Sequence, residues 1–469
     1  MGVSSIRRGQ AAMMADRRVR LSRAGSAHPH RADANRNAVG EKHARITSRT
    51  RRRGLAGLPF PSGDVMDLKS GYPFWAIRNG LMHAFPRLQR DLDCEIAVIG
   101  GGISGALIAD ELAAHGHEVA VLEQRDIAWG STAASTALLQ YEIDTHLIEL
   151  SQRFGERNAA LAYCACAAAV ERLGEVAAEL RDVDFRRQRS LYYASRSSHL
   201  PPLREEAALR ARHGLALRWL EADELAADYG LRAPGAMLSE CAAAVDPYRM
   251  TSRLLARLRR RGGQVCDRTC VEHLQAKSRG VELRTADGMR VRAGHVVVAA
   301  GYAGQRWIDQ PLARNRSSYA FVTDPLHEDE LQALRATMVW ESARPYLYLR
   351  STGDGRLVVG GCDDAVDLPA RRDRRVQSRA NRLVRQVQQR FERLHLQPAF
   401  AWAGTFAETA DGLPWFGAHA QYGPRVLFAM AYGGNGITYS MIGAGLLRAR
   451  IERRAHPLAR LFSFERSPR

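Results

Sequence analysis

A glycine-rich turn between two apolar runs constrains the fold of this chain more than any other feature. The run Ile96–Ile99 leads into glycines at 100, 101, 102 and 105. A pattern with three- and four-residue spacing covers 106–114, and a second run, Val119–Leu122, follows. Such runs are typical of strands buried on both faces of a parallel sheet, and the spacing between them is typical of a helix. The segment predicts strand, turn, helix and strand, the order of a dinucleotide-binding unit.

Each glycine of the turn has a chemical role if the ligand is a dinucleotide. Gly100 permits the tight turn, Gly102 lets the backbone approach a pyrophosphate, and Gly105 lets the helix lie close to the strand. The helix start at Ile103 and Ser104 then offers free N–H groups and a partial positive charge to the phosphates. A glycine pattern alone is a weak signal, and the flanking elements make it specific.

The acidic end of the second run indicates which nucleotide is bound. Glu123 lies 21 residues after Gly102, where a carboxylate accepts hydrogen bonds from both ribose hydroxyls. An acid at this place repels a 2′-phosphate, which argues against NADP. A small, hydroxyl-rich loop follows at 130–136, and it suits close contact with a cofactor, although it also fits an ordinary capped helix start.

Composition limits the classes of function. The chain has 469 residues, 46% of them hydrophobic and 25% charged, which predicts a globular protein of two to three domain units. No apolar stretch is long enough to span a bilayer. The seven cysteines are scattered and lack metal-ligand spacing. We therefore expect no disulfide framework, no metal site and a reducing, cytoplasmic location.

The net charge of +18 is concentrated at the N-terminus. Residues 1–65 carry 14 Lys and Arg against four acids, which leaves +8 for the rest of the chain. This segment lacks apolar periodicity and is expected to be disordered. Three interpretations stay open: a basic arm for nucleic acid, a transit-like peptide, or an upstream extension without function, with Met66 as a sufficient start. Residues 66–93 are expected to form an N-terminal extension on the domain surface, anchored by Tyr72, Phe74 and Trp75.

The rest of the chain mixes helical and strand patterns without internal repeats. Helices are expected at 142–182, 203–228, 246–261 and 371–394, and strands at 188–195, 265–270, 280–285, 290–292, 296–299, 318–322 and 337–340. A hairpin is expected at 346–361 around the turn Thr352-Gly353-Asp354-Gly355.

Together these pieces resemble the FAD-dependent oxidoreductases of the D-amino acid oxidase, glycine oxidase and sarcosine oxidase family. The resemblance covers roughly residues 90–455 and rests on seven motifs in the family's order. They are GGGISG at 100–105 with Glu123, the Gly-Ser-Thr loop at 130–132, Asp246-Pro247-Tyr248, the strand leading to Ala300-Gly301, the Tyr-Leu-Arg hairpin ending in Gly360-Gly361, Asp411-Gly412-Leu413-Pro414, and Gly433-Gly434-Asn435-Gly436.

The resemblance implies an α/β fold with two interleaved parts. A doubly wound, Rossmann-like FAD-binding domain would comprise residues 94–140, 243–305 and 400–455. An α+β substrate domain on a mixed, largely antiparallel sheet would comprise residues 141–242 and 306–399.

The resemblance also implies which residues hold FAD. The pyrophosphate would lie on the glycine turn, the adenosine ribose on Glu123, and adenine against the backbone of Val271. Residues 433–438, here called the C-terminal loop, would lie near the pyrimidine edge of the flavin. The full cofactor set is Gly100, Gly102, Ile103, Ser104, Gly105, Glu123, Gln124, Arg125, Gly130, Ser131, Thr132, Ser135, Val271, Ala300, Gly301, Gly433, Gly434, Asn435, Gly436, Ile437 and Thr438.

For the substrate, the sequence favours Arg350 as the ligand of a carboxylate, because a guanidinium on a rigid strand can grip it through two hydrogen bonds. The alternative is a surface arginine at a hairpin end. Tyr348, two residues earlier, should point to the same face and share the pocket. Tyr192, Tyr193 and Tyr432 are weaker candidates, since buried tyrosines are more often part of the core.

The sequence departs from some relatives in ways that bear on the cofactor. Members with covalent flavin attach it through a His after the Gly-Ser-Thr loop or a Cys near the C-terminal segment. Here those places read Ala133-Ala134 and Glu408-Thr409, so noncovalent FAD is expected. No lysine can be placed over the flavin as an oxygen-activating residue, which leaves the electron acceptor open between oxygen and a redox partner.

The implied reaction is removal of a hydride from the C–N carbon of an amino acid or secondary amine, giving an imine that hydrolyses. No general base is required once the amine is neutral. A FAD enzyme acting on a hydroxy acid or polyol phosphate is the alternative. A basic-arm nucleic-acid binder with structural FAD is the non-enzymatic alternative, and it depends on the charge in residues 1–65.

Overall fold

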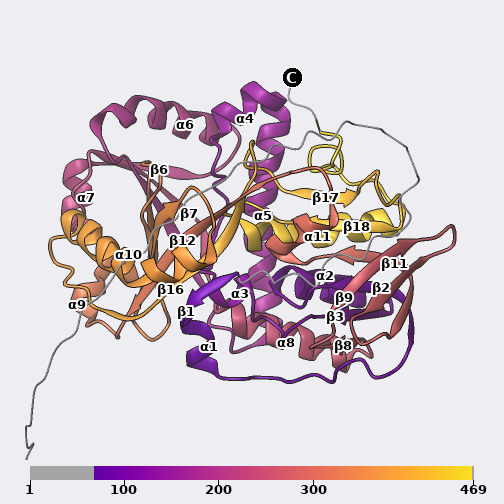
Figure 1. Cartoon of the computed structure of the whole chain (residues 1–469). Coiled ribbons are helices and arrows are strands. Elements are labelled where there is room, and N and C mark those ends of the chain that lie inside the picture. Colours follow the sequence, from indigo (N-terminus) through magenta and orange to yellow (C-terminus); the bar gives the residue numbers. More distant parts are fainter. Residues whose placement is uncertain (1–67, 467–469) are drawn as a thin grey trace, which may run out of the picture. The chain divides into compact units, whose positions relative to one another are not determined.

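The computed structural model describes residues 68–466 (Figure 1). The predictions for residues 1–65 lie outside the described residues. Within the described part of the chain, no helix has the length and apolar character needed to cross a membrane.

The first sheet contains the strands predicted around the glycine-rich turn. Five neighbouring strands run parallel in the order β18, β11, β2, β3, β8, and β17 joins antiparallel beside β18. β9 and β10 continue from β11 as an antiparallel meander. The bounds are β2 Leu92–Ile99, β3 Val119–Leu122, β8 Gln264–Cys266, β9 Val271–Ala276, β10 Val281–Thr285, β11 Arg290–Val298, β17 Trp415–Ala418 and β18 Val426–Met430.

Alternate residues of this sheet face two different layers, as the two-residue period of a strand requires. Ile96 and Val98 of β2 pack in one apolar cluster with the helices on the first face. Ala97 and Ile99 pack on the second face, in a cluster that includes the β9–β10 meander. The helices of the first face are α2 (Ile103–Ala114), α5 (Glu156–Leu180), α8 (Pro247–Arg260) and α11 (Gly436–Ile451).

The second sheet is mixed and largely antiparallel, as predicted. Its order is β1, β16, β12, β15, β14, β13, β5, β7, β4, with β6 also paired to β7, and only β13 and β5 run parallel. The bounds are β1 Lys69–Gly71, β4 Leu138–Gln140, β5 Arg186–Tyr193, β6 Leu217–Glu221, β7 Gly235–Ala244, β12 Arg314–Thr323, β13 Thr337–Glu341, β14 Tyr348–Ser351, β15 Leu357–Asp364 and β16 Pro398–Glu408.

Shorter elements and one long basic helix complete the unit. The long helix α10 (Pro369–Arg390) packs against β12 and β16 (Figure 1). Its apolar residues Ala380, Leu383 and Val387 are buried. The remaining helices are α1 Phe74–Asn79, α3 Ser131–Ala134, α4 Leu147–Phe154, α6 Leu200–Arg212, α7 Ala222–Tyr229 and α9 Glu328–Leu331, with 3-10 turns at Ser197–His199, Gly301–Trp307 and Gln332–Arg335.

The predicted fold class is confirmed, and several boundaries differ. β16 pairs with β12 over residues 398–408, so the expected domain boundary at residue 400 comes too early. A strand, β6, interrupts the helical region expected at 203–228, and the strand expected at 265–270 is shorter than predicted, because β8 ends at Cys266 and β9 begins only at Val271. In the extension, Phe74 and Trp75 are buried as predicted, whereas Tyr72 is 75% exposed and anchors nothing.

Candidate active site

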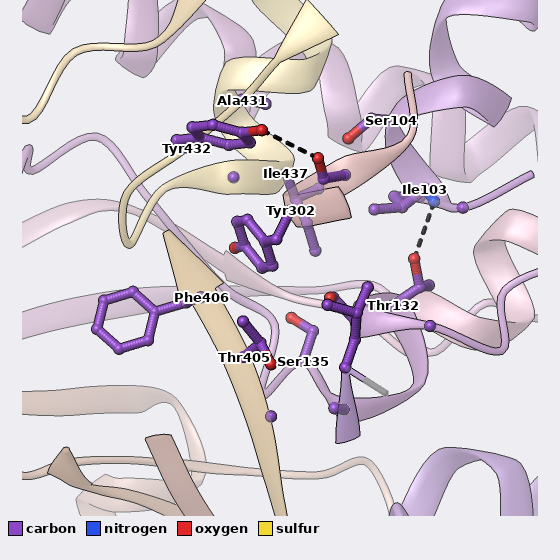
Figure 2. A pocket seen from close by; sticks show the side chains of 18 of the residues that line it. Ile103, Ser104, Thr132, Ser135, Tyr302, Thr405, Phe406, Ala431, Tyr432 and Ile437 are labelled. Carbon is purple, nitrogen blue, oxygen red and sulfur yellow. Dashed lines mark hydrogen bonds between the residues drawn. The ribbon is translucent and has the colours of Figure 1, made fainter. Parts of the chain in front are cut away.

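One long pocket lies between the two sheets. One side of the pocket lies where β2, β3 and β11 end. The glycine turn, Glu123 and Ala300 line this side. On the other side it is lined by Ser318 of β12, Tyr348 of β14 and residues of β16. Figure 2 shows part of it, with Tyr302 between the α11 start and Phe406. The carboxyl ends of parallel strands are where open α/β sheets bind ligands.

The glycine turn has no room for side chains. Gly100 has a φ of +117°, and a Cβ there would collide with the Ala299 carbonyl. A Cβ at Gly105 would collide with the Gly100 carbonyl, so this glycine lets α2 pack on β2, as predicted. No side chain caps α2 at Gly102, and the Ile103 N–H donates to Thr132 Oγ1 at 3.0 Å. The start of α2 therefore faces the pocket with its positive end.

Glu123 holds the glycine turn against the end of β3. Its Oε2 accepts from the Gly101 N–H at 2.7 Å, and its Oε1 accepts from the Arg125 N–H at 2.9 Å. Burial raises the pKa of this carboxyl, and the two backbone donors oppose that shift. Each oxygen keeps a further lone pair, so the carboxylate can accept from ribose hydroxyls as well.

Two tryptophans from distant segments fix the loop at 130–136. Trp75 Nε1 donates to the Ser135 carbonyl at 2.7 Å, and Trp402 Nε1 donates to the Ala134 carbonyl at 2.8 Å. Within this pocket, the Ser131 hydroxyl is buried and has no hydrogen-bond partner among the described residues. A buried donor and acceptor of this kind is ready for a ligand oxygen.

The C-terminal loop is held by hydrogen bonds to two segments, one at residue 407 and one at residues 142–144. The Gly433 N–H donates to the Ala407 carbonyl at 2.8 Å, and the Gly434 N–H donates to Asp144 Oδ2 at 3.0 Å. Asn435 donates to the Glu142 carbonyl at 2.7 Å. Gly436 and Ile437 then begin α11, whose N-terminal end faces the pocket.

Most of the predicted cofactor residues line this one pocket. Gly105 lies behind the turn as expected, and Thr438 donates to the Gln140 carbonyl at 3.3 Å and does not line the pocket. The predicted residues in the lining are Gly100, Gly102, Ile103, Ser104, Glu123, Gln124, Arg125, Gly130, Ser131, Thr132, Ser135, Val271, Ala300, Gly301, Gly433, Gly434, Asn435, Gly436 and Ile437.

Arg350 is not in the pocket, and we correct its predicted role. Its guanidinium is fully buried and donates to the carbonyls of Thr136 at 2.7 Å, Val245 at 2.9 Å and Ser351 at 3.2 Å. It also lies over the Trp75 ring. All its nitrogens therefore serve the fold, and none is directed at a substrate carboxylate. Tyr348, the first residue of β14 and two residues before Arg350, does line the pocket.

Aromatic side chains and two carboxylates line the end beside Tyr348. The ring centroids of Tyr346 and Tyr348 are 5.7 Å apart, and those of Tyr346 and Trp340 are 6.1 Å apart. The Tyr346 hydroxyl donates to Asp144 Oδ1 at 3.1 Å. Asp363, at the end of β15, is the second carboxylate. Of the weaker tyrosine candidates, Tyr432 lines the pocket, while Tyr192 and Tyr193 do not.

A family model described as "DAO: FAD dependent oxidoreductase" matches residues 95–450, far more than half of the chain. The chain belongs to this DAO family. The gamma-glutamylputrescine oxidoreductase of Escherichia coli (strain K12) is 28% identical over 388 residues, which is 79% of this chain and 87% of that protein. The glycine oxidase of Bacillus licheniformis is 26% identical over 347 residues, 72% of this chain and 88% of that protein. The crystal structure of glycine oxidase from Geobacillus kaustophilus superposes with a TM-score of 0.68 at 21% identity, over 80% of this chain and 99% of that one.

As a DAO-family protein the chain is an FAD-dependent oxidoreductase, and its pocket fits FAD. The start of α2 at Gly102 has no side-chain cap and faces the pocket, where it suits a pyrophosphate. Glu123 suits a ribose, and the Ser131 hydroxyl in the lining has no partner among the described residues. FAD would extend from Val271, whose carbonyl accepts from Arg306 at 3.3 Å, toward the start of α11.

Sequence reasoning missed several DAO-pocket residues. Tyr346 precedes Tyr348 by two residues, so strand spacing could have found it. Tyr302 lies in a 3-10 turn directly after the predicted residues 300–301, so only its place in the chain could have indicated it. Asp144 and Asp363 carried no signal, because an isolated aspartate at the end of an element is common at the surface.

Proposed function

We propose that this DAO-family enzyme oxidises an amine or amino acid at the carbon that bears nitrogen. FAD, when bound, accepts the hydride, and the resulting imine is hydrolysed by water. The names of the relatives support this proposal: one is an oxidoreductase of gamma-glutamylputrescine and others are oxidases of glycine. The observation that carries it is the pocket itself, in which a complete dinucleotide cradle is continuous with an aromatic chamber at Tyr302, Tyr346 and Tyr348.

The chain's contribution to the reaction is position and electrostatics. Aromatic rings exclude water from the chamber and orient the substrate. The N-terminal end of α11 at Gly436 places positive potential beside the expected flavin site, which stabilises negative charge on the reduced cofactor. A neutral amine has its lone pair available to expel the hydride, so no residue needs to act as general base.

We further propose that FAD is held without a covalent bond. The pocket lining within residues 68–466 contains neither Cys nor His, the residues to which flavins are attached in covalent members of the family. The cytoplasmic location and the choice of electron acceptor stay predictions from the sequence.

The absorption spectrum of the purified protein tests the proposal. We expect a yellow protein whose flavin band bleaches under anaerobic conditions when one class of amines or amino acids is added. Reoxidation in air would then distinguish an oxidase from a dehydrogenase. A protein that takes up FAD but is bleached only by hydroxy acids or polyol phosphates would contradict the proposal.

A further inference from the structure

The chamber contains a carboxylate with no cation of its own. Asp363 lies in the lining, its Oδ1 is buried, and this atom has no hydrogen-bond partner among the described residues. The other contact of the carboxylate is with the Ser318 side chain. The Ser318 hydroxyl lies 3.4 Å from the Tyr348 hydroxyl. A buried carboxylate left in this state is costly unless a ligand pairs with it.

Asp144, the other carboxylate of the chamber, is already engaged. Its Oδ1 accepts from Tyr346 and lies 3.5 Å from Arg344 Nη1, and its Oδ2 accepts from the Gly434 N–H. It fixes the C-terminal loop. Asp363 is therefore the carboxylate with a free oxygen.

The cations near the pocket lie away from the chamber or are engaged by other groups. Among the described residues, the cations in the pocket lining are Arg125 and Arg306, and both lie at the Val271 end, away from the chamber. Outside the lining, Arg316 donates to Glu408 at 2.5 Å. Arg344 is paired with Asp144, and Arg350 is held by three carbonyls.

The remaining walls of the chamber suit a cation as well. Tyr302, Tyr346, Tyr348 and Trp340 present aromatic rings, which attract ammonium groups through their negative faces. Burial raises the pKa of Tyr302 and of Tyr348 to about 12, so their hydroxyls stay neutral at physiological pH.

We propose that Asp363 pairs with a cationic nitrogen of the substrate, so that this site selects aliphatic amines, diamines above all, over amino acids with a carboxylate on the reacting carbon. The inference rests on the proposed function and names its substrate class. The reacting nitrogen must be neutral when its carbon loses the hydride, whereas the second nitrogen of a diamine stays protonated and can bind Asp363. A substrate carboxylate or phosphate would instead meet two acidic residues and no free cation.

Anaerobic rapid mixing of the holoenzyme with a matched series of compounds tests the selection. The series is 1,4-diaminobutane, butylamine, 4-aminobutanoate and glycine. We expect the diamine to reduce the flavin at the lowest concentration. In Asp363→Asn we expect its apparent Kd to rise at least tenfold while the limiting rate of reduction changes less. The control is Asp324→Asn, which removes a carboxylate that is 83% exposed. Its apparent Kd for the diamine and its limiting rate of reduction should equal those of the parent protein.

A non-reacting cation tests the site apart from the chemistry. Calorimetric titration of the holoenzyme with tetramethylammonium chloride should show binding that Asp363→Asn weakens at least tenfold. This titration tests the cation site even if no compound bleaches the flavin. Absence of bleaching would contradict the proposed function but would leave the cation site untouched. Unchanged affinity in Asp363→Asn, or tighter binding of glycine than of the diamine, would overturn the inference.

The pH dependence of that titration needs no variant. Burial raises the pKa of Asp363 to about 6. The negative charges of Asp144 and Glu408 raise this pKa as well, whereas a hydrogen bond with Ser318 and the positive charge of Arg316 lower it. The charge of tetramethylammonium does not change with pH. Its affinity should therefore fall about tenfold between pH 8 and pH 5, as Asp363 becomes neutral, and should stay flat in Asp363→Asn. A flat profile in the parent protein would contradict the role of this carboxylate.

Discussion

At the scale of single residues, sequence spacing identified the cofactor cradle but not the substrate groups. Gly100, Gly102 and Glu123 could be placed because their roles depend on neighbours within 25 residues of chain. The role of Arg350 could not be predicted in this way, because its partners, the carbonyls of Thr136 and Val245, come from two distant segments. A guanidinium on a strand can serve a ligand or the backbone equally well, and only the packed structure distinguishes the two.

Arg350→Met tests this reassignment. The substitution removes the donors of three buried carbonyls, and we expect it to lower the free energy of unfolding by about 2–4 kcal/mol. Thermal unfolding measures the loss, and the exposed Arg385→Met on α10 is the control. If Arg350 bound a substrate carboxylate instead, the substitution would raise KM for an amino acid and leave Tm nearly unchanged.

At the scale of elements, the long and strongly patterned segments were predicted correctly and the short ones were not. β2, α2 and β3 appeared where the apolar runs placed them. β6 was missed because its five residues lie between two amphipathic helices, and it becomes a strand by pairing with β7. Pairing energy supplied by a distant strand leaves little trace in local sequence.

The contact between α2 and the glycine turn gives a prediction at this scale. Gly105→Ala places a methyl group against the Gly100 carbonyl and should push α2 away from β2. We expect the apparent Kd for FAD to rise at least tenfold, measured by the flavin retained after gel filtration. Gly445→Ala on α11 meets no atom within 4 Å and should bind FAD normally. Equal FAD retention in both variants would show that the turn tolerates the displacement.

At the scale of the whole molecule, the predicted interleaving of two sheets follows the order of the strands along the chain. The chain leaves the parallel sheet after β3, builds β4 to β7, returns for β8 to β11, leaves again for β12 to β16 and ends with β17, β18 and α11. The resemblance supplied this plan, because topology cannot be deduced from local periodicity. The boundary near β16 was misjudged because this strand of the second sheet is followed, after a short turn, by β17 of the parallel sheet.

Removal of residues 1–65 tests the non-enzymatic alternative. A chain that starts at Met66 keeps the residues of the pocket. We expect its FAD content and its reduction by amines to equal those of the full chain. Binding of DNA or RNA by both forms, measured by fluorescence anisotropy at two salt concentrations, is the second readout. A salt-sensitive affinity present only in the full chain would favour the basic arm.

The tryptophan contacts to the loop at 130–136 have a thermodynamic consequence. Trp75 comes from the extension and Trp402 from β16, so the N-terminal extension and the second sheet meet at a loop that lines the pocket. Any ligand that binds only the folded loop shifts the unfolding equilibrium of every segment tied to it. We therefore expect FAD binding to raise the free energy of unfolding of the whole unit, so that a shortage of the cofactor lowers the amount of native protein as well as its activity.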